Sequence, residues 1–257
     1  MPTTLTFVAH QDDDLIFMNP DVASDEQAKY NVWVVYLTAG QDTGGMEYAN
    51  KRIEGARAAH ARAAKVDNNW TPEILSLAGH DVATNTLDGT NVRLAFTYIW
   101  SASGEAGDPN GDLYRMWFDA NFVAQPIDGR AAYTKSSFLD MLRAVISTAK
   151  PDYIRTQNTI TNRDVDHIDH ISGALFAAQA DSCQGRTVTQ RDEYLDYVIK
   201  EMPPNIEGYW ATEKLEIFNK YLEHDAKAFE WREVYNRQYR RKVYKPKDRW
   251  VPRTDHF

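Results

Sequence analysis

Histidine and aspartate gather in a short segment near the amino terminus, at residues 9–14, which read AHQDDD and directly follow an apolar run. Neighbouring carboxylates repel one another, and burying them is costly unless they bind a cation or pair with an opposite charge. The three aspartates beside His10, among them Asp12 and Asp14, are therefore typical of a metal site. The alternative is a solvated acidic turn that caps the next helix.

A second cluster of the same residue types lies far along the chain, at residues 164–170, which read DVDHIDH. It follows a predicted strand at 152–156, and loops at the carboxyl ends of parallel strands form the ligand crevice of open α/β sheets. His167 and His170 are three positions apart, so they lie on one side of the segment if it is helical. The adjacent aspartates, including Asp169, are suited to orient the two imidazole rings, as carboxylates do around metal ligands.

Together the two clusters supply two histidines and one aspartate for a metal ion, with coordination positions left open for water. This donor set suits Zn²⁺ in a hydrolase, and it also suits Fe²⁺ or another divalent metal. An additional carboxylate beside the ligands is what a general base in hydrolysis requires. The residues thus favour metal-assisted hydrolysis.

Three other classes of function stay open at this point. Asp12 and Asp14 after a strand are similar to the nucleophile loop of a Mg²⁺-dependent phosphatase, although His10 and the second cluster then have no role. A non-catalytic carbohydrate-binding protein would retain the same residues without turnover. A non-haem iron oxygenase fits the number of ligands but leaves the additional carboxylate unexplained.

The elements that position these clusters alternate between strand and helix along the chain. Apolar and β-branched runs predict strands, and apolar residues at helical spacing predict helices. The expected strands are at 4–9, 31–38, 73–77, 92–99 and 152–156. The expected helices are at 47–66, 136–148, 171–180 and 212–225. The pattern predicts an α/β fold, a Rossmann-like and mostly parallel sheet flanked by helices, with the active site at the carboxyl ends of the strands.

The chain has 257 residues and a formal net charge of −8. Its length and the lack of a linker predict a single domain over 1–257, which ends in a basic and aromatic extension at about 230–257. Trp231, Tyr235 and Tyr239 recur there at every fourth position, which predicts a helix that packs an aromatic stripe on the core. The acidic net charge argues against nucleic acid as a partner.

Cys183 is the only cysteine in the sequence, so intramolecular disulfides and cysteine-based zinc sites are excluded. His60, in the expected helix 47–66, is interpreted as a surface or packing residue. No run of 18 apolar residues is present, so we expect no transmembrane segment. Since no signal-type segment follows Met1, we expect a cytoplasmic protein or a mature secreted form.

The two clusters resemble the signature motifs of the PIG-L / LmbE-like N-acetylglucosaminyl deacetylases. AHQDDD is similar to the AHPDDE of that family, and DHIDH is similar to its HPDH-type second motif. The resemblance extends to residues 37–40, which match an LTxG at the end of the second strand, and to the helix start around Arg52. It covers residues 4–225, and the pair His224 and Asp225 falls where the family has a late polar site.

The resemblance implies a zinc-dependent enzyme that removes the acetyl group from an N-acetylglucosamine-type sugar, with a small molecule or a glycoconjugate as substrate. It implies metal binding by His10, Asp13 and His170, general base catalysis by Asp12, support of the oxyanion or protonation of the leaving amine by a protonated His167 paired with Asp169, and substrate binding by Arg52 and His224.

The sequence departs from the family pattern at two positions of the first motif and along its last third. Gln11 stands where the family has proline, and Asp14 stands where it has glutamate. Neither change removes an implied metal ligand. The divergence of the last third leaves the acetylated substrate open, along with the native metal and the oligomeric state.

Overall fold

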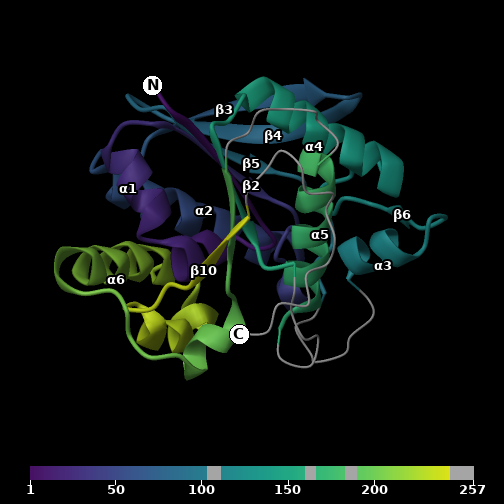
Figure 1. Cartoon of the computed structure of the whole chain (residues 1–257). Coiled ribbons are helices and arrows are strands. Elements are labelled where there is room, and N and C mark those ends of the chain that lie inside the picture. Colours follow the sequence, from purple (N-terminus) through teal and green to yellow (C-terminus); the bar gives the residue numbers. More distant parts are fainter. Residues whose placement is uncertain (103–110, 160–165, 183–189, 244–257) are drawn as a thin grey trace.

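One large, mostly parallel sheet with helices on both faces forms the centre of the molecule (Figure 1). The computed structural model describes residues 1–102, 111–159, 166–182 and 190–243. Within these residues the sheet has eight strands in the order β10-β9-β8-β1-β2-β5-β4-β3. The five strands from β9 to β5 run parallel, whereas β10, β4 and β3 pair antiparallel with their neighbours. The predicted α/β class is thereby confirmed.

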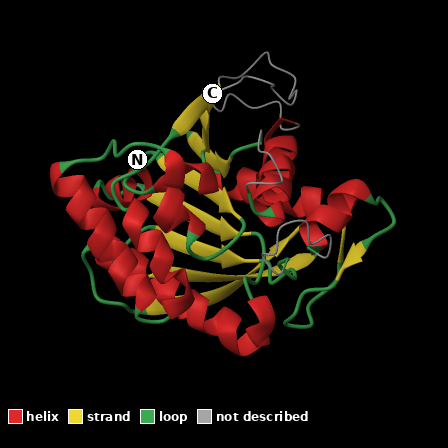
Figure 2. Cartoon of the chain, turned by 90° about the horizontal axis from the view of Figure 1, so that it is seen from below, coloured by secondary structure: helices red, strands yellow, loops and turns green. Residues whose placement is uncertain are grey.

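The strands of this sheet are β1 (Thr3–Val8), β2 (Asn31–Tyr36), β3 (Trp70–Leu77), β4 (His80–Leu87), β5 (Val92–Phe96), β8 (Tyr153–Gln157), β9 (Gln190–Tyr194) and β10 (Arg240–Val243). Two short strands, β6 (Val123–Ala124) and β7 (Tyr133–Thr134), form a second small sheet. Figure 2 shows the strands of the large sheet side by side, with helices packed on both sides of them.

The α-helices are α1 (Asp21–Gln27), α2 (Gly45–Ala64), α3 (Asp112–Phe118), α4 (Lys135–Ala149), α5 (Ile168–Ser182) and α6 (Gly208–Leu222). Shorter helical segments are the π-helix η1 (Asp14–Met18) and the 3₁₀ segments η2 (Asp42–Gly44), η3 (Tyr197–Glu201) and η4 (Ala226–Val234). Helices α1, α2 and α6 lie on one side of the sheet, and α3, α4 and α5 lie on the other (Figure 1).

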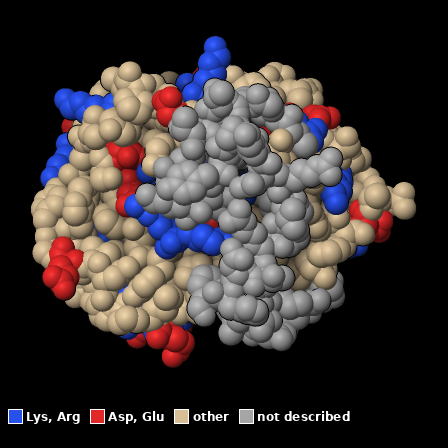
Figure 3. Space-filling model, viewed as in Figure 1, with Lys and Arg blue, Asp and Glu red and all other residues tan. Residues whose placement is uncertain are grey.

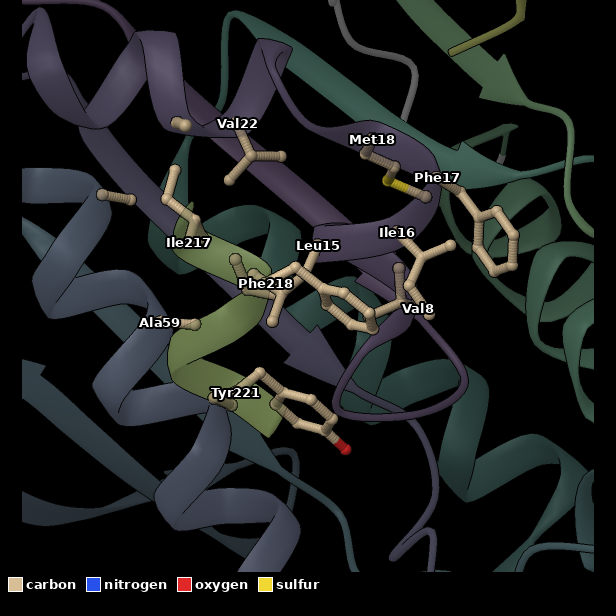
Figure 4. Close-up of a cluster of buried hydrophobic side chains, with 14 of the residues drawn as sticks. Val8, Leu15, Ile16, Phe17, Met18, Val22, Ala59, Ile217, Phe218 and Tyr221 are labelled. Atoms are coloured by element: carbon tan, nitrogen blue, oxygen red, sulfur yellow. The ribbon is translucent and has the colours of Figure 1, made fainter. Parts of the chain in front are cut away.

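Each face of the sheet has its own apolar core, because successive side chains of a strand point to opposite faces. On β2, Val34 joins the core under α1, α2 and α6, whereas its neighbour Val35 joins the core under α4 and α5. Figure 4 shows part of the first core, where Leu15 of η1 lies beside Phe218 and Tyr221 of α6. The segment after β1 is therefore held between the sheet and α6.

Helices α2 and α6 approach closely at Gly55. A Cβ atom at this position would lie 2.8 Å from Cδ2 of Tyr221 and 3.1 Å from the Tyr221 carbonyl oxygen. Tyr221 is fully buried. The absence of a side chain at Gly55 thus allows Tyr221 to reach across the surface of α2 toward the end of β1.

The carboxyl-terminal segment differs from the single amphipathic helix that the aromatic spacing predicts. Trp231 does pack on the core, with its ring centroid 5.4 Å from that of Phe17, but it lies in the 3₁₀ segment η4. The chain then turns into β10, whose Arg240 and Arg241 contact carboxylates of the sheet and α1. Pairing with an edge strand competes successfully with helix formation here, and residues 244–257 lie outside the described part of the chain.

Several further elements were not anticipated from the sequence, among them β4 and α3. Strand β4 reads HDVATNTL, and its many polar residues hide the apolar alternation that predicts a strand. Helix α3 begins at Asp112, where a loop is the simpler interpretation of the sequence. Among the described residues, no helix is both long and apolar enough to cross a membrane.

Candidate metal centre and active-site pocket

The three consecutive aspartates of the first motif point in three different directions. Asp12 and Asp13 lie between β1 and the π-helix η1, and Asp14 is the first residue of η1, at the carboxyl edge of the sheet. Asp12 pairs with Arg52 of α2, Asp13 lies beside the histidines His10 and His170, and Asp14 contacts His60 of α2. All three carboxylates are buried, and each one faces a group of opposite or potentially opposite charge.

Donor atoms of His10, Asp13 and His170 converge on one point. His10 Nδ1 lies 3.2 Å from His170 Nε2, which in turn lies 3.1 Å from Asp13 Oδ1. Asp13 Oδ2 lies 3.5 Å from His10 Nδ1. Ligands that are about 2.0–2.2 Å from a shared tetrahedral ion lie about 3.3–3.6 Å apart, so these atoms need only small shifts to hold one. The three residues fit a divalent cation.

The remaining nitrogen of each histidine faces a carboxylate. His10 Nε2 lies 3.3 Å from Asp169 Oδ2, and His170 Nδ1 lies 2.8 Å from Asp166 Oδ1. Such contacts orient the rings of metal-binding histidines and direct the other nitrogen toward the ion. Asp164, the first aspartate of the second cluster, lies outside the described residues.

Burial raises the pKa of Asp13, but the adjacent His170 and His10 outweigh burial and hold it well below its usual range. Asp13 is therefore an ionised carboxylate, the form in which aspartate binds a metal.

Arg52 holds Asp12 in place from the opposite wall. Its Nη2 donates to Asp12, its Nη1 donates to the Gly40 carbonyl at 3.1 Å, and its Nε donates to the Tyr221 hydroxyl at 2.8 Å. Burial raises the pKa of Asp12, and the Arg52 guanidinium opposes that increase. The structure thus brings the predicted base and Arg52 together.

His167 lies in the same pocket as His10, and their ring centroids are 4.6 Å apart. The backbone amide of Asp169 donates to His167 Nδ1 at 3.1 Å, which leaves the hydrogen of the neutral ring on Nε2. Burial and the neighbouring His10 lower the pKa of His167 to about 3. The described contacts therefore favour a neutral His167, in contrast to the protonated ring that the sequence led us to expect.

Asp169 is placed differently from the expected partner of His167. Its Oδ2 lies 3.8 Å from His167 Nδ1, farther than from His10 Nε2, and accepts a hydrogen bond from the Ala102 amide at 2.8 Å. Asp169 is fully buried. Its closest histidine is the predicted metal ligand, so in this structure it orients His10.

The pocket above these residues has a volume of about 180 Å³. His224 is exposed and is not among the residues that line it, whereas the next residue, Asp225, is buried and lines it. Asp225 Oδ1 accepts from the Tyr48 hydroxyl at 2.5 Å, and Oδ2 accepts from the Tyr221 hydroxyl at 2.8 Å. The family resemblance places a late polar site at the pair His224 and Asp225, and of these two residues Asp225 lines the pocket.

Several residues of the pocket wall were not identified from the sequence, among them Asp42, Tyr48 and Lys227. They come from η2, α2 and the segment around η4, which are far apart along the chain. A helix or loop pattern indicates that such residues are polar and does not indicate which of them face a common cavity. The pair Glu47 and Tyr48 illustrates this, because Glu47 is exposed and only Tyr48 reaches the pocket.

His60 is also placed differently from expectation. It is fully buried, with Nδ1 2.5 Å from Glu26 Oε1 and Nε2 3.1 Å from Asp14 Oδ2, and the Tyr36 hydroxyl lies 3.1 Å from Nε2. Burial acts to lower the pKa of His60, but the two carboxylates outweigh it and raise the pKa to about 10. His60 is neither a surface nor an apolar packing residue but a buried cation.

The sequence of the chain is similar to that of a known protein family. The sequence profile of the PIG-L family, described as GlcNAc-PI de-N-acetylase, matches residues 5–180 and confirms the resemblance of the motifs. No curated protein sequence matches the chain significantly.

Several solved structures share the fold. N,N'-diacetylchitobiose deacetylase from Pyrococcus horikoshii superposes with a TM-score of 0.53 at 12% identity, covering 90% of this chain and 74% of that one. The 4-carboxy-2-hydroxymuconate hydratase GalB from Pseudomonas putida KT2440 gives 0.52 at 13%, covering 91% and 83%. The A40926 pseudoaglycone deacetylase Dbv21 gives 0.51 at 12%, covering 95% and 96%. At these identities the likeness concerns the fold.

Proposed function

Because the chain belongs to the PIG-L family, we propose that it is a metal-dependent hydrolase, with zinc as the metal, that removes an acetyl group from an N-acetylglucosamine-type sugar or sugar conjugate and releases acetate and a free amine. The observation that carries the proposal is the convergence of His10 Nδ1, His170 Nε2 and the Asp13 carboxylate beside a separate buried carboxylate, Asp12. Likeness of fold would not suffice, since one neighbour is a hydratase.

The proposed metal ligands are His10, Asp13 and His170. A divalent cation bound there would polarise the substrate carbonyl and lower the pKa of water in the pocket. Two imidazoles and one carboxylate form a donor set that zinc enzymes use, with a position left for substrate or water. Asp166 and Asp169 orient the two histidines from the side away from the pocket.

Asp12 is proposed as the general base. Its carboxylate lines the pocket beside the ligands and can accept a proton from the attacking water. Arg52, which is itself fixed by Tyr221 and Gly40, keeps the carboxylate oriented. In this scheme Arg52 orients Asp12 in addition to binding the substrate, which is the role that the family resemblance implies for it.

His167 is proposed to stabilise negative charge on the carbonyl oxygen. Its Nδ1 accepts from a backbone amide, so Nε2 carries the hydrogen that can be donated. A neutral imidazole can supply a hydrogen bond to a developing oxyanion, which is worth about 10²–10³-fold in other enzymes. As the carbon–nitrogen bond breaks, Asp12 can pass the proton that it accepted from the water to the nitrogen, which leaves as a neutral amine.

The phosphatase alternative has less support in the geometry. It requires Asp12 and Asp14 to act on one phosphoryl group, but Asp14 turns away from the pocket and contacts His60 and Tyr36. A non-catalytic carbohydrate-binding protein remains the alternative, and acetate release decides between it and the enzyme.

The test is acetate release from a panel of N-acetylated sugars and sugar conjugates, with zinc, with Fe²⁺ and with chelator. We expect chelator to abolish release and zinc to restore it. Asp12→Asn should reduce kcat by about 10³-fold, the usual range for loss of a general base, while the protein retains its zinc. Asp140→Asn, at an exposed ion pair on α4, is the matched control. Full activity of the Asp12 variant, or binding of sugars without acetate release by the zinc-loaded protein, would refute the proposal.

A further inference from the structure

The two halves of the pocket come from different parts of the sequence. The proposed metal ligands, Asp12 and Arg52 all lie within residues 5–180, the segment that the family profile matches. The outer wall joins Asp225, Lys227 and Trp231, which lie beyond that segment, to Asp42 and Tyr48, which lie within it. Residues that distinguish this chain's substrate from those of its relatives are therefore to be sought where the two parts of the chain meet in the outer wall.

An ion pair crosses the outer wall. Lys227 Nζ of η4 lies 2.5 Å from Asp42 Oδ2 of η2, and both residues line the pocket. The two side chains keep 59% and 32% of their surface exposed, so solvent and ligands reach them. Lys227 Nζ also lies 4.6 Å from the centroid of the Tyr48 ring, a second favourable contact for its charge.

Both members of the pair stand on a fixed backbone. The side chain of Gln41, next to Asp42, bonds to Ser101 through three contacts of 3.0–3.2 Å. Asp42 itself has a φ of 43°, in the left-handed region that residues other than glycine rarely adopt. On the other side, the Lys227 amide donates to Asp225 Oδ1 at 3.2 Å. The donor and the acceptor are thus held in place before any ligand arrives.

Among the described residues that line the pocket, carboxylates outnumber cations. Lys227 is matched by Asp42, whereas Arg52 faces both Asp12 and Asp225, and its Nε lies 3.4 Å from Asp225 Oδ2. A phosphate or carboxylate on the ligand would face Asp42 and would have to break its pair with Lys227. A hydroxyl group meets no such conflict, because it can donate to the carboxylate and accept from the ammonium at the same time.

We propose that Asp42 and Lys227 determine specificity by binding an uncharged hydroxyl of the substrate, and that they select neutral N-acetylated sugars over phosphorylated ones. The proposal rests on the proposed deacetylase function. In this proposal Asp42 and Lys227 bind a part of the sugar away from the reacting amide. Loss of either side chain therefore weakens substrate binding and leaves the rate of the chemical step unchanged.

The experiment compares wild type, Lys227→Gln and Asp42→Asn on N-acetylglucosamine and on its 1-phosphate and 6-phosphate. For the neutral sugar, we expect both variants to raise KM by about 10-fold with kcat within about twofold, as for loss of a hydrogen bond to a charged group. Asp42→Asn, which leaves Lys227 unpaired, should lower KM for at least one phosphorylated sugar. Lys220→Gln, at an exposed pair with Glu223, should match wild type throughout.

Failure of the inference about Asp42 and Lys227 and failure of the proposed deacetylase function give different results. Unchanged KM in the variants, or a lower KM of wild type for a phosphorylated sugar, would overturn the role of the pair while acetate release still supports the enzyme. Absence of acetate release from every sugar would overturn the proposed function. In that case calorimetry measures binding of the same three sugars to the wild-type protein. The inference is refuted if the protein binds none of them, or if it binds a phosphorylated sugar more tightly than the neutral one.

Discussion

Two clusters of buried histidine and carboxylate lie on either side of the same run of aspartates, and they differ in one respect. At His10 and His170, one ring nitrogen faces a carboxylate and the other converges with Asp13 on a shared point. At His60, Nδ1 faces Glu26 and Nε2 faces Asp14. The first cluster leaves room for an ion between its members, whereas in the second the imidazolium is itself the cation.

The residue types alone therefore do not determine whether a buried histidine binds a metal ion or forms an ion pair. Both clusters combine imidazole with carboxylates and are buried, and burial alone would lower the pKa of every histidine in them. Every ring nitrogen in the two clusters faces a carboxylate, so what separates the clusters is how the rings are arranged. His10 Nδ1 and His170 Nε2 lie 3.2 Å apart and share Asp13, whereas His60 lies alone between Glu26 and Asp14. Three measurements test this difference between the clusters.

The largest effect is expected at the open cluster. His170→Gln should remove a metal ligand and reduce acetate release by about 10³-fold or more, because the ion's contribution amounts to several kcal/mol. Bound zinc, measured per protein molecule after dialysis, should fall well below one. A His170 variant that keeps a full equivalent of zinc would show that the ligands lie elsewhere.

A smaller effect, on stability and not on metal content, is expected at the closed cluster. His60→Gln leaves Asp14 and Glu26 without their cation, and loss of one member of a buried ionic group costs about 3 kcal/mol of unfolding free energy. Denaturant unfolding measures this loss. His80→Gln is the matched control, since His80 is buried against the Tyr133 ring and no carboxylate among the described residues pairs with it. An equal loss in both variants would mean that packing, and not charge, gives His60 its role.

The smallest effect is a dependence of stability on pH. The pKa of His60 is raised from 6.5 to about 10, so between these values the folded chain retains a proton that the unfolded chain releases. The resulting stabilisation is complete below about pH 6.5 and is lost as the pH rises through about 10. Melting temperatures of wild type and His60→Gln should therefore converge as the pH rises. Parallel curves across this range would contradict a protonated His60.

Much of the candidate site could be predicted because its chemistry lies in two contiguous motifs. His10 and the aspartates beside it are local in sequence, and the strand before them fixes which edge of the sheet they occupy. The roles assigned to these residues stay predictions until activity is measured. The family and the α/β fold are confirmed.

The rest depends on contacts between distant segments. The partners of His60 come from η1, α1 and β2, and no pattern within α2 indicates that they meet it. Asp225 and Lys227 reach the pocket from more than 170 residues beyond Asp42, through the packing of α6 on α2. Strand β4 is held by its two neighbours in the sheet despite a polar sequence.

Because α6 approaches α2 closely at Gly55, the distance between these two helices determines how the active-site residues are positioned. Tyr221 reaches Arg52 only because no side chain separates the helices there, and Arg52 in turn fixes Asp12. A single methyl group at Gly55 would meet both the ring and the backbone of Tyr221, so α6 would have to shift as a body. The orientation of Asp12, the proposed base, thus depends on the spacing of two helices at Gly55, a residue that takes no part in the reaction.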